Sequence, residues 1–551
     1  MSLYCYPIIV RVDAARWNRG FHLHLVLLPF PYNDVMNLRH VIAYLVLSAL
    51  SACSVNPVTG DRDLMLVSGE QELAMGLQNY GPMQQSQGGS YDVDPALTAY
   101  VENIGHKLAA ISEVKLPYEF VVLNNSVPNA WALPGGKIAI NRGLLTELNS
   151  EAELAAVLGH EVVHAAARHS AQQMSRGMMT QGLVLATTVA ANDSGYGDLA
   201  AMGAGLAGQL TLSKYGRDAE LESDKYGMRY MSKAGYDPQG AVALQETFVK
   251  LSEGRDQDWV SGLFASHPPS EERVKENRRR AKKLPAGGEL GTDRYAAVMK
   301  KTMAVKPAYD AYDKGRKALG EKKNDEALAL ANEALTLFPE EANFHALRGD
   351  VRLVNKQYDM AVTNYNRAIT RRDDFFYYHL QRGIAKQELG QTDSAMVDLE
   401  RSLEIMPTAP AHLTLGEIKE QRGQIDEAIE HYKIVAKSGS GDVAKSAYEA
   451  LLRLELPTQP ASYISSACGS ENGGQIVVQV RNDTPVSVTG VQVQFQYVDS
   501  SGTQRQKVQN FSGELAPGKI VSAGTGLTPY PSTRCDAAVI QARPVETPSR
   551  P

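Results

Sequence analysis

The sequence contains few cysteines, four in 551 residues, which is too few for a scaffold built on disulfides. It also lacks a strong charge of one sign, because 56 lysines and arginines stand against 62 aspartates and glutamates, giving a formal net charge of −6. Because the sequence has no excess of basic residues, nucleic-acid binding is disfavoured. The length predicts about three or four domains of ~150 residues each.

Long apolar runs are missing as well. Val41–Ala49 is apolar but much shorter than the ~20 residues that a transmembrane helix needs. Gly182–Ala191 is also apolar, but Asn192 and Asp193 end the run. We therefore expect any membrane attachment to come from a lipid and not from a membrane-spanning helix.

The first of these runs lies in a stretch with the features of an export signal. Met36 opens it, Arg39 supplies a positive charge, and the stretch ends L-S-A-C at Leu50–Cys53. This ending resembles a bacterial lipobox, which predicts that Cys53 is lipidated; an ordinary thiol behind a cleaved signal is the alternative. Ser54 follows the cysteine, which resembles sorting to the outer membrane. An exported, periplasmic lipoprotein is the expectation.

A helix with a metal-binding pattern is predicted at Ser150–Ser170. Ser150 and Glu153 form the pattern of a capping box at its start. His160 and His164 lie one turn apart on one face, where both imidazoles can reach the same metal ion. Glu161 lies beside them, placed to take a proton from a metal-bound water. A chance pattern on an ordinary amphipathic helix is the alternative.

A third protein ligand is required for a catalytic zinc site. Ala219–Gly227 reads A-E-L-E-S-D-K-Y-G, and Glu220 and Asp224 share one face of the predicted helix. Glu220 is the candidate ligand. Asp224 is expected to orient a metal ligand without binding the metal itself, and Glu222 lies on a different face of the helix. The alternative is a solvated acidic face.

Together these patterns resemble family forty-eight of the metallopeptidases over roughly residues 55–281. The matching blocks, in the order of the family, are N-A-W-A-L-P-G-G (Asn129–Gly136), H-E-V-V-H with the following R-H, E-L-E-S-D-K-Y-G, A-G-Y-D-P (Ala234–Pro238) and S-H-P-P-S-E-E-R (Ser266–Arg273). The resemblance implies a zinc endopeptidase with one zinc ion per chain. His160, His164 and Glu220 would be its ligands, with Glu161 as the base and Asp224 in support.

The resemblance also implies a substrate-binding strand. In the family the strand corresponding to Lys137–Asn141 edges the cleft and pairs with an extended substrate, which makes Pro134, Gly135 and Gly136 candidate substrate-binding residues. A hairpin turn of a small sheet is the other interpretation, and the two are compatible.

His267 is expected on an extended segment, because Pro268 and Pro269 follow it. In relatives the corresponding histidine can occupy the open zinc position and hold the enzyme inactive, so His267 is a possible regulatory zinc ligand. A histidine that caps the following helix is the alternative. His169 is predicted to support a ligand without touching the metal.

After a charged connector the chain repeats with a period of 34, 34 and 33 residues at Gly315, Gly349, Gly383 and Gly416. This is the tetratricopeptide period, with small residues where paired helices touch. Stacked helix pairs make a groove for a peptide or a partner protein, although a rigid spacer is the alternative.

The C-terminal region changes to alternating, strand-like patterns from Pro457 onward, which predict a small β-sandwich. Cys468 and Cys535 flank it, and in an exported protein they are expected to form a disulfide. Two free thiols are the alternative.

The expected fold class is therefore α+β: a mainly helical, gluzincin-type peptidase domain with a small sheet, an α-solenoid of tetratricopeptide repeats, and a small β-sandwich. The expected divisions are an over-extended start (1–35), a lipoprotein signal peptide (36–52), the peptidase (53–290), the repeats (305–455) and the sandwich (462–545).

The expected activity is hydrolysis of unfolded or misassembled envelope proteins, in outer-membrane protein quality control, with the repeats recruiting clients or partners. The alternative is a repeat-based assembly factor for outer-membrane proteins whose peptidase is mostly latent.

Overall fold

The computed structural model describes residues 53–179, 215–252, 267–438, 441–470, 474–529 and 535–545. The expected start and signal peptide, the side chain of Cys53, and the apolar run at 182–191 lie outside the described residues. Two compact units divide the chain between Lys314 and Gly315, with Glu333–Pro339 assigned to the first unit. No described helix is long and apolar enough to cross a membrane.

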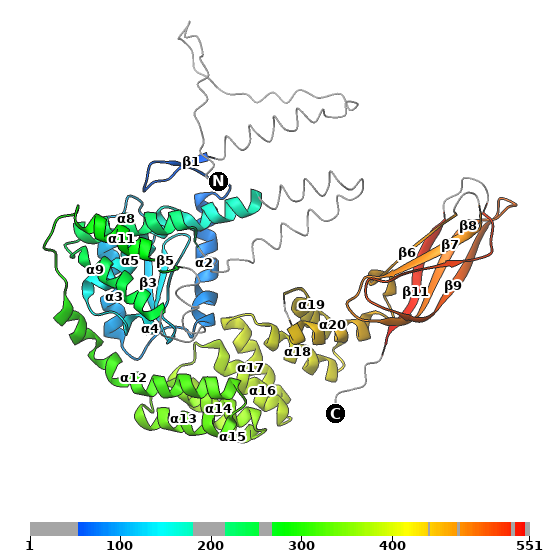
Figure 1. Ribbon diagram of the computed structural model, residues 1–551. Coiled ribbons are helices and arrows are strands. Elements are labelled where there is room, and N and C mark those ends of the chain that lie inside the picture. The colour runs from blue at the N-terminus through cyan, green and yellow to red at the C-terminus, as the bar shows by residue number, and fades with distance from the viewer. Residues whose placement is uncertain are drawn as a thin grey trace, which may run out of the picture. The chain divides into compact units, whose positions relative to one another are not determined.

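The first unit is mainly helical (Figure 1). Its elements are β1 (Cys53–Val55), β2 (Arg62–Leu64), α2 (Gly69–Ser86), α3 (Pro95–Ala109), β3 (Glu119–Leu123), β4 (Ala130–Leu133), β5 (Lys137–Asn141), α4 (Arg142–Leu145), α5 (Glu151–Ala166), α8 (Arg217–Lys233), α9 (Gln239–Ser252), α11 (Glu271–Ala281) and the first part of α12 (Thr292–Gly320). The described part of the unit holds a two-stranded sheet, β1-β2, and a three-stranded sheet, β3-β5-β4. The expected class, helix-rich with small sheets and helical repeats, is confirmed.

The order of strands in the three-stranded sheet differs from what the sequence led us to expect for the substrate-binding strand. Its order is β3-β5-β4, so the predicted strand Lys137–Asn141 is the central one. It pairs in parallel with β3 and antiparallel with β4, and both of its edges are therefore occupied. The expectation that this strand edges a cleft is wrong. In the described part of the chain, the strand next to α5 that keeps an unpaired edge is β4.

The turn between β4 and β5 is a packed element. Gly135 and Gly136 have φ of +79° and +83°, a conformation that favours glycine. Pro134, Gly135 and Gly136 are buried, and a Cβ added to Gly76 of α2 would lie 1.9 Å from the Pro134 carbonyl oxygen. The turn is thus covered by α2, and a substrate-binding role of Pro134, Gly135 and Gly136 stays a prediction.

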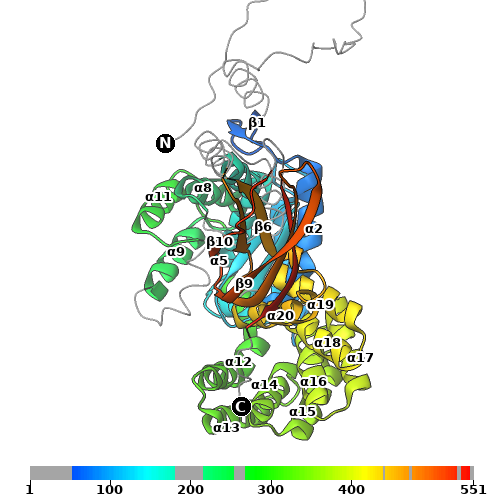
Figure 2. The same cartoon turned by 90° about the vertical axis from the view of Figure 1, so that its right-hand side faces the viewer.

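The second unit begins with helices that follow one another as antiparallel pairs (Figure 2). Gly349 of α14 faces Tyr365 of α15, and a Cβ on this glycine would lie 2.7 Å from the tyrosine ring, so only glycine permits this approach. The helices are α13 (Asn324–Leu337), α14 (Ala342–Val354), α15 (Tyr358–Arg371), α16 (Phe376–Glu388), α17 (Thr392–Ile405), α18 (Ala409–Gln421), α19 (Ile425–Ser438) and α20 (Gly441–Glu455). The 34-residue period of the sequence therefore corresponds to one helix pair.

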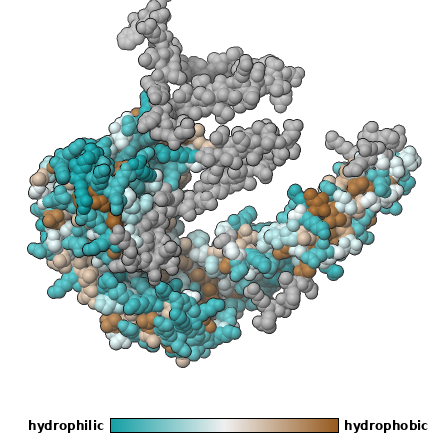
Figure 3. Space-filling view, in the orientation of Figure 1, coloured by the Kyte–Doolittle hydropathy of each residue, from teal (hydrophilic) through white to brown (hydrophobic). Residues whose placement is uncertain are grey.

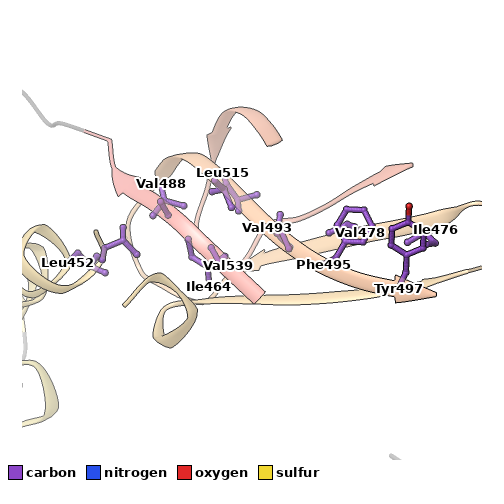
Figure 4. Close-up of a cluster of buried hydrophobic side chains, with 14 residues drawn as sticks. Leu452, Ile464, Ile476, Val478, Val488, Val493, Phe495, Tyr497, Leu515 and Val539 are labelled. Carbon is purple, nitrogen blue, oxygen red and sulfur yellow. The ribbon is translucent and has the colours of Figure 1, made fainter. Parts of the chain in front are cut away.

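The unit ends in two three-stranded sheets, ordered β10-β7-β6 and β11-β8-β9, preceded by the 3-10 turn Pro460–Ser462. The strands are β6 (Ile464–Ser470), β7 (Ile476–Asn482), β8 (Val488–Val498), β9 (Gln504–Leu515), β10 (Ile520–Gly524) and β11 (Asp536–Pro544). Alternate side chains of both sheets share one apolar core, centred on Val478, Val493 and Phe495 (Figure 4). Cys468 of β6 and Cys535, next to β11, are joined by a disulfide with their Cα atoms 5.6 Å apart.

Candidate metal centre

Helix α5 carries the first two candidate ligands in the interior of its unit. Ser150 caps it by accepting a hydrogen bond from the Glu153 amide at 3.2 Å. In a capping box the Glu153 carboxylate would accept a hydrogen bond from the Ser150 amide. Here it accepts from the amide of the preceding residue, Asn149, at 2.9 Å. All sixteen residues of α5 are buried. His160 and His164 are consequently buried, with their Nε2 atoms 2.9 Å apart.

Helix α8 packs against α5 and brings Glu220 to the two histidines. The approach is close because both helices have glycine at the crossing: a Cβ on Gly227 would lie 3.0 Å from the backbone of Gly159. Glu220 is 1% exposed. Its carboxylate oxygens lie 3.5 Å from His160 Nε2 and 3.4 Å from His164 Nε2.

His267 completes the cluster from a segment just before α11. Its Nδ1 lies 3.0 Å from Glu220 Oε1 and 3.2 Å from His160 Nε2. Its Nε2 lies 3.5 Å from Glu161 Oε1. The side chain is 3% exposed. Sequence spacing could not place His267, because more than a hundred residues separate it from α5.

The donor set fits a zinc ion. One ligand atom from each of His160, His164, Glu220 and His267 lies within 4.8 Å of the others. Imidazole nitrogens with a carboxylate oxygen are typical zinc donors. Glu161 is 2% exposed, and its Oε2 has no hydrogen-bond partner among the described residues. A buried carboxylate oxygen normally has a partner, and a water held between the metal and Glu161 would provide one.

A second layer of polar residues orients the first two histidines. Asp224 Oδ1 lies 3.0 Å from His160 Nδ1, as expected for a carboxylate that orients a ligand. His169 Nδ1 lies 2.9 Å from His164 Nδ1, and Glu222 Oε1 lies 3.3 Å from His169 Nε2. This arrangement agrees with the predicted supporting position of His169 and shows that Glu222 points away from the cluster.

Two residues near the cluster were given no role by sequence reasoning. Arg273, on the first turn of α11, donates to both Asp224 oxygens at 2.8 and 2.7 Å and pairs with Glu220 Oε2 at 2.8 Å. Its only signal in the sequence is its position at the end of S-H-P-P-S-E-E-R. Tyr215 stacks on His164 with ring centroids 3.9 Å apart, and its sequence context contains no comparable signal.

In the metal-free cluster the two carboxyls and the two histidines of α5 have pKa values shifted in different directions. Burial raises the pKa of Glu220, but His267 and His160 outweigh it and lower the value. Burial also raises the pKa of Asp224, but Arg273 and His160 outweigh it and lower the value, so both carboxyls are ionised. Burial lowers the pKa of His160, but Glu220 and Asp224 outweigh it and raise the value to about 9. Burial lowers the pKa of His164 well below its usual range, which keeps this imidazole neutral and able to bind a metal.

Comparisons with known proteins agree with this geometry. Residues 95–281 match the model of the family described as Peptidase family M48, and residues 312–375 match that of the Tetratricopeptide repeat. The chain is 33% identical over 202 residues to a putative beta-barrel assembly-enhancing protease of Vibrio cholerae, covering 35% of this chain and 40% of the relative. It is 26% identical over 390 residues to the beta-barrel assembly-enhancing protease of Yersinia pestis, covering 66% and 79%. The mitochondrial metalloendopeptidase OMA1 of Schizosaccharomyces pombe is 33% identical over 188 residues, 32% of this chain and 51% of that protein.

Proposed function

Because the chain contains a peptidase family M48 domain followed by tetratricopeptide repeats, we propose that it is an exported zinc metalloendopeptidase acting on unfolded or misassembled envelope proteins. The observation that carries this proposal is the buried cluster of His160, His164 and Glu220 with Glu161 beside it. The family name supports the peptidase chemistry, and the matched repeats support a site for protein partners.

Zinc would be held by His160, His164 and Glu220, and when bound it supplies a Lewis acid that polarises the scissile carbonyl and acidifies a water. Glu161 accepts a proton from the attacking water and passes it to the leaving amine. Burial raises the pKa of Glu161, which favours a group that receives and returns a proton. Asp224 holds His160 at Nδ1 and keeps its Nε2 directed at the metal position.

The unpaired edge of β4 is the proposed binding site for the substrate backbone, in place of the central strand expected from the sequence. Ala130 of β4 lines the same small cavity as His160 and Glu161. An extended peptide paired along this edge would bring its backbone to the cluster, and backbone hydrogen bonds would impose little sequence preference.

Location and client are proposed from the sequence and the relatives. Lipidation at Cys53 would anchor the protein to the outer membrane from the periplasmic side, and the repeats would recruit clients or partners. Two of the relatives are named for enhancing beta-barrel assembly, which supports outer-membrane proteins as the client class. No nucleic-acid partner is proposed.

The first test is hydrolysis of an unfolded casein by the purified protein. We expect cleavage that stops when a chelator removes the metal and returns when zinc is restored, because the bound zinc would supply the Lewis acid that polarises the scissile carbonyl. The readout is fragment formation on gels together with zinc content by elemental analysis. Fragments that persist in a metal-free sample would exclude the proposal.

A second candidate function, an assembly factor with a latent peptidase, is favoured by one observation. His267 lies among the three proposed ligands and within 3.5 Å of Glu161, so it can occupy the position that a water needs. We expect His267→Ala to raise the casein cleavage rate about tenfold. This factor corresponds to a wild-type protein in which His267 leaves the metal site open in roughly one molecule in ten.

The control for this change is His106→Ala, which removes an exposed histidine of the same unit and should leave the rate unchanged. Equal rates in wild type, His267→Ala and His106→Ala would exclude a plugging role for His267. Cleavage seen only in His267→Ala would mean that the enzyme is latent until a partner withdraws this residue.

A further inference from the structure

A basic pocket lies between α13, α14 and α15, and none of its lining residues belongs to the candidate metal centre. It is a cavity of about 310 Å³ lined by Arg348, Arg352 and Arg367 and by one acidic residue, Asp359, with Asn332, Asn364 and Met360 among the other lining residues. Arg348 is half-buried and Arg367 is exposed. Nothing in the proposed peptidase mechanism uses these residues.

The next repeat shows what normally balances such charges. Arg382 and Lys386 lie 34 residues after Arg348 and Arg352 and thus at equivalent positions. Asp398 neutralises both, because Arg382 Nε donates to it at 2.8 Å and Lys386 Nζ lies 2.8 Å from it. The position equivalent to Asp398 in the earlier repeat is occupied by Asn364.

This difference leaves Arg348 without the carboxylate partner that Arg382 has in the next repeat. Asp359 also lines the pocket, but among the described residues it forms no ion pair with the three arginines. Arg348 Nε donates to Asn364 Oδ1 at 2.7 Å and its Nη1 donates to Asn332 Oδ1 at 3.2 Å, so its partners are neutral amides. Within the described part of the chain, none of Arg348, Arg352 and Arg367 forms an ion pair with a carboxylate. Burial lowers the pKa of Arg348, and the other two arginines lower it further, because the three positive charges repel.

We propose that this pocket binds a carboxylate-bearing segment of a partner polypeptide, either acidic side chains or a C-terminal carboxylate, which supplies the anion that Asn364 does not. The arginine guanidinium matches a carboxylate with two parallel hydrogen bonds. The pocket volume admits one or two such groups but not a folded domain, so the ligand is an extended segment. The inference does not depend on the metal centre.

A polypeptide fits better than an anionic membrane. Lipid surfaces are recognised by clusters of about 4–8 basic residues spread over a face, whereas the adjacent Arg371 and Arg372 already have acidic partners in Glu340 and Asp374. Arg371 and Arg372 therefore add no uncompensated charge beside the pocket. Met360 at its edge is 53% exposed and offers an apolar contact to a neighbouring side chain. The surface of the first helix pairs is otherwise mostly hydrophilic (Figure 3).

The test is a fluorescence-anisotropy titration of the purified protein with a labelled hexapeptide containing three glutamates and a free C-terminus. Its counterpart has glutamines and an amidated end, and mass spectrometry verifies that both probes stay intact. We expect the acidic probe to bind, to weaken as salt is raised, and to bind at least about tenfold more weakly to Asn364→Asp. The substitution adds the carboxylate found in the next repeat and should preserve the thermal unfolding temperature.

The matched control is Asn366→Asp, which adds the same charge to the same helix beside Arg382, in the neighbouring pocket. It should change affinity less than about twofold. Equal binding of the two probes, or equal binding to wild type and Asn364→Asp, would overturn the proposal. So would binding to phosphatidylglycerol vesicles without binding to the acidic probe, since the ligand would then be a lipid headgroup.

Discussion

Replacing Glu161 with glutamine should lower the rate of casein cleavage by at least about a thousandfold, within the range attributed to general acid–base groups. Glutamine keeps the shape of the side chain but cannot accept a proton from water. Zinc content should stay unchanged, because Glu161 is not among the four clustered donors. The measurement is the initial cleavage rate in wild type and variant, with zinc determined on the same samples.

The matched control for this substitution is Glu153→Gln on the same helix. Glu153 is also buried, but its carboxylate contacts Asn149 at the start of α5 and not the cluster. This variant should keep the cleavage rate within a few-fold of wild type. A Glu161→Gln protein that binds zinc and still cleaves casein at the wild-type rate would remove Glu161 from the mechanism. Loss of zinc together with activity would assign it a role in metal binding.

Replacing Arg273 with methionine should destabilise the metal-free first unit by about 3–5 kcal/mol, the usual result of breaking a buried ion pair from one side. Arg273 is 4% exposed and is the cation shared by Asp224 and Glu220. Methionine fills a similar volume but leaves both carboxylates without that partner. Arg273→Lys should be intermediate, because an ammonium cannot reproduce the paired hydrogen bonds.

Tryptophan fluorescence during urea unfolding measures this effect selectively. The sequence has three tryptophans, at positions 17, 131 and 259, and all precede the boundary at Lys314. The control is Arg278→Met on the same helix, where an exposed pair with Glu246 is removed and less than about 1 kcal/mol should be lost. Similar losses for both variants would show that Arg273 holds no special position in the cluster.

Several features of this protein follow from local sequence alone. Three residues between His160 and His164 put both imidazoles on one helical face, whatever packs against that helix. The 34-residue spacing of small residues from Gly315 onward specifies helix pairs, because each repeat contains its own pairing surface. The alternation from Gln475 onward specifies strands for the same reason: side chains in a strand point to opposite faces with period two.

Other features were decided only by the tertiary structure, because they depend on segments far apart in the chain. The sheet order makes β5 central, and a strand's own residues do not reveal how many neighbours it has. His267 and Arg273 reach the cluster through the packing of α11 against α8. No sequence pattern singled out Asn364. The structure places it beside Arg348, and the next repeat has Asp398 at the equivalent position beside Arg382. Sequence spacing thus determines which side chains share one face of a helix or strand. Tertiary packing determines which of these side chains come into contact across different elements.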